Sequence, residues 1–233
     1  MRKPGTRTLI KVCGITNPDD AMAAVEAGAD YLGLIFVPIS PRSVSETQVQ
    51  AVVETVRRQN HSVKLVGVFQ NALPAEMGRM IGMLGLDLVQ LHGDESLKIC
   101  EALPVPVIKA LTIQPGMLPE AVIRLLECYA PSTESNIRSV LLDTPKTADA
   151  TTHSWVRVAD LLLQERVQAR LRAMRYFLAG GLVPETVGQV VEDFLPDGVD
   201  VASGVESAPG QKDHDKLRAF CRAVRHVENA GVQ

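Results

Sequence analysis

The chain has 233 residues, of which 46% are hydrophobic and only 4% aromatic, and its formal net charge is -3 at pH 7. This length is enough to bury a full core without disulfides or metals, and that core must consist mainly of aliphatic side chains. Because the two signs of charge are interspersed and give no basic face, nucleic acids and anionic membranes are poor candidates as partners.

The cysteines also limit the possible classes of protein. Cys13, Cys100, Cys128 and Cys221 form no CxxC pair and have no histidine at the spacing of a zinc site. A disulfide framework is not expected in a chain of this length, so we predict reduced thiols, no metal and a cytoplasmic location. The apolar stretch near the amino terminus is interrupted by Lys11, which argues against a signal peptide, and no run is long enough to span a membrane.

Short apolar runs alternate with amphipathic stretches along the whole chain. Strand-like runs lie at 9–15, 31–36, 64–69, 86–92, 105–111, 139–144, 176–182 and 198–205. The stretches after them predict helices at about 18–28, 45–59, 74–84, 94–102, 118–130, 154–173, 184–195 and 213–229. Eight strand–helix units without a linker predict one α/β domain over residues 1–233, folded as a (β/α)₈ TIM barrel.

Local signals support these helices. Asn17 before Pro18 is typical of a helix start, and Ser45 with Gln48 has the spacing of a capping box. The last predicted helix carries an apolar stripe that should face the barrel, made of Leu217, Phe220, Cys221, Val224 and Val227. An open doubly wound sheet is the rival fold, but the turn at 13–16 lacks the GxGxxG pattern of a dinucleotide site.

Polar residues and glycines follow nearly every predicted strand, where a barrel carries its functional groups. Gly180-Gly181 and Ser203-Gly204 follow the seventh and eighth strands, which is where barrels commonly bind phosphate. Each pair alone is equally compatible with an ordinary turn. Their occurrence together favours a phosphate site.

Two residues are candidates for acid–base chemistry. Asp143 ends an apolar run, where partial desolvation raises a carboxyl pKa towards the range of a general acid; the alternative is a loop cap. Cys13 is either a small core residue or, beside Lys11 on the same side of its strand, a thiol of lowered pKa that acts as base or nucleophile.

Three further side chains at these strand ends have open roles. Arg42, in a Ser-Pro-Arg loop, is either a bidentate grip for a carboxylate or a solvated charge. Lys109 is either a Schiff-base nucleophile or a charge at the barrel mouth. His92 is either a proton carrier or a hydrogen-bonded structural histidine.

Seven segments, in order from the first strand to the eighth, resemble phosphoribosylanthranilate isomerase. They are Lys11-Val12-Cys13-Gly14-Ile15-Thr16, Ser40-Pro41-Arg42, Val89-Gln90-Leu91-His92-Gly93, Val107-Ile108-Lys109-Ala110, Leu141-Leu142-Asp143-Thr144, Ala179-Gly180-Gly181-Leu182 and Asp200-Val201-Ala202-Ser203-Gly204-Val205-Glu206. The segment Pro209-Gly210, followed by Lys212-Asp213-His214, also resembles the family. The resemblance covers nearly the whole chain.

The resemblance implies an Amadori rearrangement in tryptophan biosynthesis, which converts N-(5'-phosphoribosyl)anthranilate to 1-(2-carboxyphenylamino)-1-deoxyribulose 5-phosphate without a cofactor. It implies that Asp143 is the general acid, that Cys13 is the general base, and that Arg42 binds the anthranilate carboxylate. It further places Lys11, His92 and Asp200 at the substrate, and Gly180, Gly181, Ser203 and Gly204 at its phosphate. The expected partner is this small phosphorylated substrate, bound by a monomer or a homodimer.

One stretch departs from the family pattern. Family members usually carry a glycine-rich loop after the catalytic aspartate, whereas residues 145–154 contain no glycine and only the following Trp155 is retained. Glycines in such a loop permit close approach to substrate and hinge closure. Two alternative functions therefore stay open: a decayed barrel that binds a phosphorylated ligand without turnover, and a Schiff-base lyase that uses Lys109.

Overall fold

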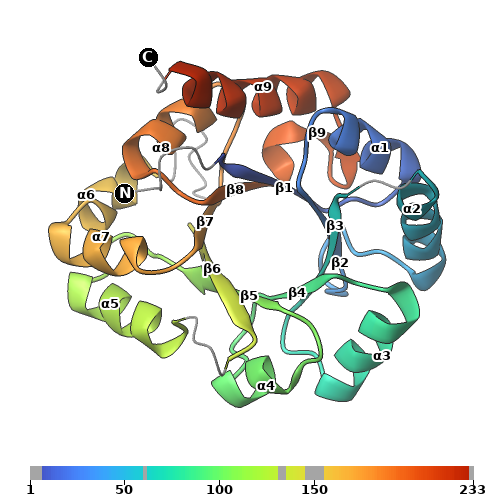
Figure 1. Cartoon of the computed structure of the whole chain (residues 1–233), viewed down its shortest axis with the longest axis horizontal. Helices are drawn as coiled ribbons and strands as arrows, with labels where there is room; N and C mark the ends of the chain where they lie inside the picture. Colours follow the sequence, from blue (N-terminus) through green and yellow to red (C-terminus); the bar gives the residue numbers. More distant parts are fainter. Residues whose placement is uncertain (1–6, 60–61, 131–134, 145–154, 231–233) are drawn as a thin grey trace.

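The structure, a computed structural model, describes residues 7–59, 62–130, 135–144 and 155–230. Eight parallel strands form a closed barrel in the order β1 to β8, with β1 paired to both β2 and β8. The helices lie outside this ring of strands (Figure 1). This arrangement confirms the predicted (β/α)₈ barrel.

The strands of the barrel are short and follow the predicted runs. They are β1 (Leu9–Cys13), β2 (Tyr31–Ile35), β3 (Lys64–Phe69), β4 (Leu88–Leu91), β5 (Val107–Thr112), β6 (Ile137–Asp143), β7 (Tyr176–Ala179) and β8 (Gly198–Val201). Several end earlier than predicted. In β7 the reason is local, because Gly180 and Gly181 have φ of 92° and 66°, which no strand residue adopts.

The helices alternate with these strands. They are α1 (Pro18–Glu26), α2 (Glu46–Arg58), α3 (Pro74–Leu84), α4 (Leu97–Ala102), α5 (Pro119–Cys128), α6 (Val156–Leu162), α7 (Glu165–Arg172), α8 (Val187–Phe194) and α9 (His214–Ala230). Both predicted caps are confirmed. Asn17 accepts a hydrogen bond from the Asp20 backbone at 2.9 Å, and Ser45 and Gln48 form a complete capping box.

Several helix predictions were wrong in detail, and the helix predicted from residue 94 begins only at Leu97. The single helix predicted at 154–173 is divided into α6 and α7, because Gln164 has a ψ of 133° and leaves the helical conformation. The helix predicted from residue 184 begins only at Val187. The Val183 carbonyl accepts from both Thr186 and Val187, which forms a turn before the helix.

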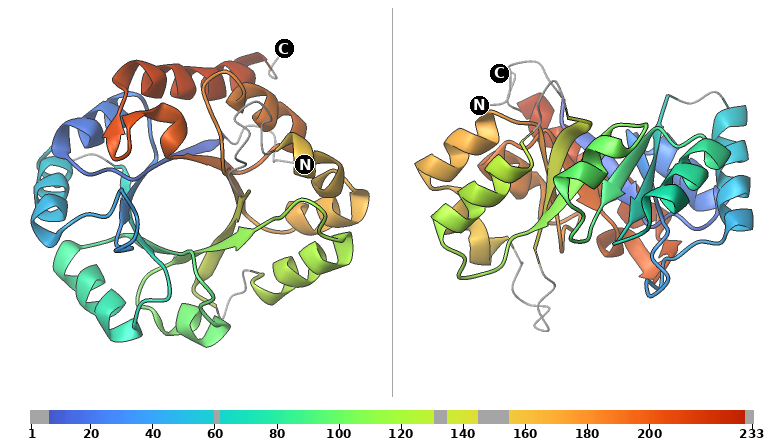
Figure 2. Two further views of the ribbon diagram at one scale, coloured as in Figure 1. Left: turned by 180° about the vertical axis from the view of Figure 1, so that it is seen from behind. Right: turned by 90° about the horizontal axis from the view of Figure 1, so that it is seen from below.

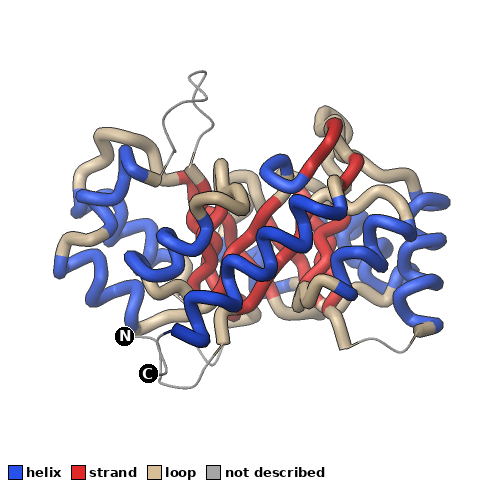
Figure 3. The backbone as a smooth tube through the Cα atoms, turned by 90° about the horizontal axis from the view of Figure 1, so that it is seen from above, coloured by secondary structure: helices blue, strands red, loops and turns tan. Residues whose placement is uncertain are grey.

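The core has two parts, one between the strands and the helices and one inside the barrel. The aliphatic stripe of α9 belongs to the outer part, as predicted, with Leu217, Phe220, Cys221 and Val224 buried. In the side view of Figure 3, helices flank the strands of the barrel. Inside the barrel, the buried apolar side chains are Val66, Ile108, Ala110, Leu141, Phe177 and Ala179.

A small hairpin follows β8 that the sequence did not predict. After the 3₁₀ turn η1 (Ser203–Val205), strands β9 (Glu206–Ala208) and β10 (Gln211–Lys212) pair in antiparallel fashion. Figure 2 shows this hairpin beside the loop that joins β2 to α2. Among the described residues, no helix is both long and apolar enough to cross a membrane.

Candidate active site

A pocket of about 180 Å³ opens at the carboxyl ends of the strands. Nine of the ten residues that the sequence predicted for the site line it, namely Cys13, Arg42, His92, Asp143, Gly180, Gly181, Asp200, Ser203 and Gly204. They converge because the carboxyl ends of all eight parallel strands meet at one face of the barrel. Their chemical roles remain predictions.

Lys11, the tenth predicted residue, does not line the pocket. Its side chain is fully buried, and Nζ lies 3.0 Å from each carboxylate oxygen of Asp200. Burial lowers the pKa of Lys11, but the charge and hydrogen bonds of Asp200 outweigh this effect and the pKa is raised. Lys11 therefore forms a buried ion pair beneath Asp200, and the pair presents only Asp200 to the pocket.

Cys13 ends β1 and is 6% exposed, with its side chain on the pocket wall. Its neighbour in β2 is Gly33, and a Cβ on Gly33 would lie 2.8 Å from the Cys13 Sγ. The predicted lowering of the thiol pKa was wrong for this structure: burial raises the pKa of Cys13 and outweighs the opposite effect of Lys11. A thiolate base here depends on neighbouring cations.

Gly33 is thus a site residue that the sequence did not single out. Replacing it with alanine is expected to abolish most activity and to destabilise the fold by about 1–3 kcal/mol, because the new methyl group overlaps Cys13 and the core cannot expand. Gly82→Ala is the matched control, since Gly82 is an exposed residue of α3 with open space around it. Turnover and thermal unfolding of both variants test this prediction. A Gly33→Ala protein of normal activity would contradict the close packing of Gly33 against Cys13.

Asp143 lies at the end of β6, with its side chain 27% exposed. Its Oδ2 is 3.2 Å from His92 Nε2, and His92 Nδ1 is 3.3 Å from the Gln90 side-chain amide. Gln90, His92 and Asp143 thus form a row of contacting side chains, and this row orients the Asp143 carboxyl group in the pocket. Asp143 also faces Asp200, whose pKa is raised by burial and further by the Asp143 charge, while Lys11 opposes both.

The two predicted phosphate-binding segments contact each other. A Cβ on Gly204 would lie 1.8 Å from the Leu182 carbonyl oxygen, so only glycine allows this approach. A Cβ on Gly180 would lie 2.7 Å from Asp143 Oδ1. The loops after β7 and β8 therefore form one continuous wall of the pocket, next to the Asp143 carboxyl group.

Arg42 lies in the loop after β2 and binds a carboxylate of the protein itself. Its Nε and Nη2 donate to Glu206 Oε1 and Oε2 at 2.8 and 2.6 Å, in the planar bidentate geometry of an arginine–carboxylate pair. Gly14, with a φ of 74°, passes close beneath Arg42, and a Cβ there would lie 2.7 Å from the arginine Cδ. Arg42 still lines the pocket.

Lys109 lies outside the barrel, contrary to the predicted place at its mouth. Its neighbours Ile108 and Ala110 point inward, so Lys109 points towards the helices. Its Nζ donates to Glu95 at 2.9 Å and to the carbonyls of Gly93 and Leu91. A buried ammonium group in this arrangement is not available as a nucleophile, and the structure therefore argues against the Schiff-base lyase.

The described residues contain no group of three or more histidine, cysteine, aspartate or glutamate side chains placed to hold a metal ion.

The comparisons with known proteins agree with one another. The family model for N-(5'-phosphoribosyl)anthranilate (PRA) isomerase matches residues 10–223. A relative of that name from Pseudomonas putida is 42% identical over 219 residues, which cover 93% of this chain and 97% of that protein. The chain belongs to the phosphoribosylanthranilate isomerase family.

Solved structures of phosphoribosylanthranilate isomerases have the same fold. The enzyme from Thermotoga maritima superposes with a TM-score of 0.78 at 31% identity, over 94% of this chain and 99% of that one. A structure of a phosphoribosyl anthranilate isomerase in complex with reduced 1-(o-carboxyphenylamino)-1-deoxyribulose 5-phosphate has a TM-score of 0.77 at 31% identity, with the same coverage.

One departure from the phosphoribosylanthranilate isomerase pattern cannot be placed in this site. The glycine-free stretch 145–154 lies outside the described residues. Trp155, which follows it, is buried and packs against Phe194 with ring centroids 5.9 Å apart. The tryptophan thus has a packing role in the core.

Proposed function

We propose that the protein catalyses the Amadori rearrangement of N-(5'-phosphoribosyl)anthranilate to 1-(2-carboxyphenylamino)-1-deoxyribulose 5-phosphate in tryptophan biosynthesis. The single observation that carries this proposal is that Cys13 and Asp143 line one pocket together with the glycine loops after β7 and β8. The predictions of one domain over residues 1–233, a monomer or homodimer, and a cytoplasmic location stay part of the proposal.

The pocket has room for the acid and the base on different sides of the substrate. Cys13 comes from β1 and Asp143 from β6, which are not neighbours in the barrel. A substrate between them can be protonated at one atom and deprotonated at another without either group moving far. Each such group contributes about 10²–10⁴-fold to the rate in enzymes of known mechanism.

In the first step, we assign the proton donor to Asp143. Its proton goes to the furanose ring oxygen, the bond between that oxygen and C1' breaks, and the nitrogen lone pair forms the Schiff base. His92, 3.2 Å from Asp143, fixes the orientation of the carboxyl group. Gln90 Oε1 is buried on the pocket wall and accepts no hydrogen bond from the described residues, which leaves it for a hydroxyl group of the opened sugar.

In the second step, we assign the base to Cys13. Its thiolate takes the proton from C2', and the electrons of that bond form the enolamine while the iminium charge is neutralised. Return of a proton to C1' and loss of the enol proton give the ketose, so the reaction has no net proton change. Lys11 opposes the effect of burial on the Cys13 thiol and favours its ionised form.

The two ends of the substrate are charged, and we assign a site to each. The phosphate fits the backbone N–H groups of Gly180, Gly181, Ser203 and Gly204, where two glycine turns meet. The anthranilate carboxylate fits the N–H groups of Arg42 that Glu206 does not use. Binding at both ends holds C1' and C2' at the catalytic pair.

Complementation tests the proposal. The gene is expressed in a tryptophan auxotroph that lacks this isomerase, and we expect growth without tryptophan. Failure to grow, combined with binding of a reduced product analogue by the purified protein, would instead support a decayed barrel that binds a phosphorylated ligand without turnover.

A further inference from the structure

We propose that Lys212 is a positioning residue for the isomerisation, which fixes the backbone of Cys13 and, through Glu206, the guanidinium group of Arg42. Lys212 lies in the hairpin that the sequence did not predict, and the mechanism above gives it no part. The inference rests on the proposed function, because that function gives Cys13 and Arg42 their roles.

The side chain of Lys212 is fully buried and ends among three oxygen atoms. Its Nζ donates to the Cys13 carbonyl at 2.7 Å, to the Ala202 carbonyl at 3.1 Å and to Glu206 Oε1 at 2.9 Å. An ammonium group has three N–H donors, so each proton has one acceptor and the charged form is the one that fits. The ammonium thereby joins the end of β1, the loop after β8 and the hairpin.

Glu206 extends this network to the guanidinium group of Arg42. Its Oε1 accepts from both Lys212 and the Arg42 Nε, and its Oε2 accepts from the Arg42 Nη2. The Glu206 side chain is almost completely buried, and these cations hold the pKa of its carboxyl group below the usual range despite burial. The plane of the Arg42 guanidinium is therefore set by Glu206, whose own position is set by Lys212.

The backbone around Lys212 is itself held in place. The Lys212 backbone N–H donates to Asp20 Oδ2 at 2.9 Å, and Asp20 Oδ1 lies 2.8 Å from His214 Nε2. Asp20 is buried in the first turn of α1, directly after the loop that follows Cys13. The backbone of Lys212 is thus fixed, and a residue that positions two others must itself be held in place.

Lys212 also contributes to the electrostatic environment of the thiol. The charged groups around Cys13 are Lys11 on the same strand, Asp200 on β8, Arg42 in the loop after β2, and Lys212 on β10. Burial and Asp200 raise the pKa of Cys13, whereas Lys11 and Lys212 lower it. Burial lowers the pKa of Lys212 itself, and Glu206 opposes this change.

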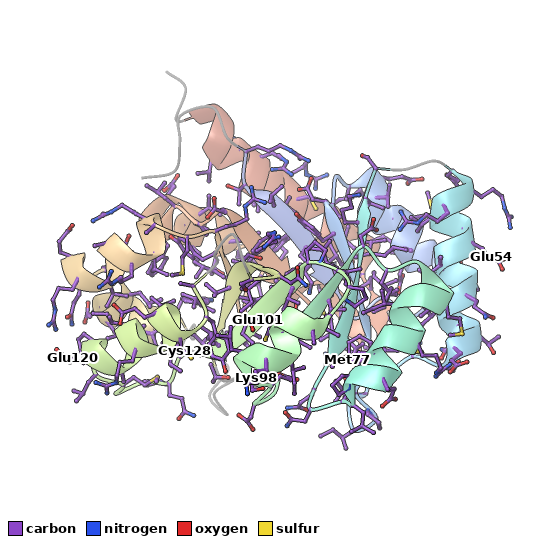
Figure 4. The ribbon with its side chains drawn as sticks, turned by 60° about the horizontal axis from the view of Figure 1, so that its bottom comes forward. Glu54, Met77, Lys98, Glu101, Glu120 and Cys128 are labelled. Atoms are coloured by element: carbon purple, nitrogen blue, oxygen red, sulfur yellow. The ribbon has the colours of Figure 1, made fainter. Side chains whose placement is uncertain are left out.

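The decisive test measures the thiol without relying on turnover. Full-length wild type and Lys212→Met are alkylated with iodoacetamide over a range of pH, and modification is followed on the Cys13 peptide by mass spectrometry. We expect the midpoint of the pH dependence of Cys13 alkylation to rise by about half a pH unit or more in the variant. Below that midpoint, alkylation should be roughly threefold slower than in wild type. Cys128, which is exposed on α5 (Figure 4), is the internal reference and should react alike in both proteins.

Lys216→Met is the matched control. Lys216 lies in the first turn of α9 and its Nζ donates to the Glu206 backbone carbonyl at 3.1 Å. Its side chain is half-exposed, and no contact joins it to the Glu206 carboxylate or to Cys13 among the described residues. Removing it takes away the same charge but leaves the contacts of the Glu206 carboxylate with Lys212 and Arg42 in place. We expect the alkylation midpoint of Cys13 in this control to equal that of wild type.

Steady-state kinetics separate the two positions that Lys212 fixes. Lys212→Met should lower kcat about tenfold or more through Cys13, whereas Glu206→Gln should chiefly raise KM, by about tenfold, through Arg42. If Lys212→Met does not fold, Lys212→Gln keeps N–H donors without the charge, and the same rise in the midpoint is expected. An unchanged midpoint in a folded Lys212 variant would overturn the inference, whereas a wild type without turnover would overturn only the proposed function.

Discussion

Replacing Cys13 with alanine is expected to lower kcat for phosphoribosylanthranilate by about 10²–10⁴-fold, the usual contribution of a general base. The loss should fall on kcat, since the proposed mechanism assigns the thiol to the proton of C2' and to neither charged end of the substrate. The fold should survive, because alanine removes one atom from the wall of a solvent-accessible pocket. Steady-state turnover and thermal unfolding of the purified variant are the measurements.

Cys128→Ala provides the comparison for this variant, since Cys128 is exposed and lies at the end of α5, away from the pocket. Its kcat should equal that of wild type. A folded Cys13→Ala protein with normal kcat would exclude Cys13 as the base. The carboxylate of Asp200, which also lines the pocket, would then be the candidate base to examine.

Asp143→Asn is expected to reduce kcat over the same range of about 10²–10⁴-fold. Asparagine keeps the shape of aspartic acid and still accepts a hydrogen bond from His92, but it has no acidic proton to give to the ring oxygen. KM should change little, because the phosphate and carboxylate sites are untouched. Pre-steady-state measurements should show that ring opening, and not product release, has become slow.

The control for this substitution is Asp193→Asn on the exposed surface of α8, where the aspartate accepts a hydrogen bond from Gln189. It should have the kinetics of wild type. Normal turnover by Asp143→Asn would instead assign the proton donor elsewhere in the row, with His92 as the first candidate.

Much of this molecule could be predicted from the sequence, because its organisation is local and repetitive. The period of the apolar residues identifies each strand and helix, and the alternation of eight such units leaves one closed barrel as the simplest arrangement. The same logic locates the site. Cys13 and Asp143 each end a strand and the turn at Gly180 follows one, and parallel strands bring their carboxyl ends together.

The partners of these residues could not be predicted, because they come from distant parts of the chain. Alternation places Lys11 on the same side of β1 as Cys13, but it does not reveal that Asp200, 189 residues later, neutralises it. The burial that raises the pKa of Cys13 is likewise a property of the closed barrel. Gly33 gave no signal either, since its importance lies in the missing Cβ beside a sulfur atom on the next strand.

The pair formed by Arg42 and Glu206 has a consequence for the entropy of binding. A free arginine side chain on a loop samples many rotamers, and ordering such a side chain on association costs about 0.5–1.5 kcal/mol. Here the bidentate contact with Glu206 already restricts those rotamers before any ligand arrives. If Arg42 binds the anthranilate carboxylate as proposed, that carboxylate meets a preorganised guanidinium group, and most of the energy of the contact remains available as affinity.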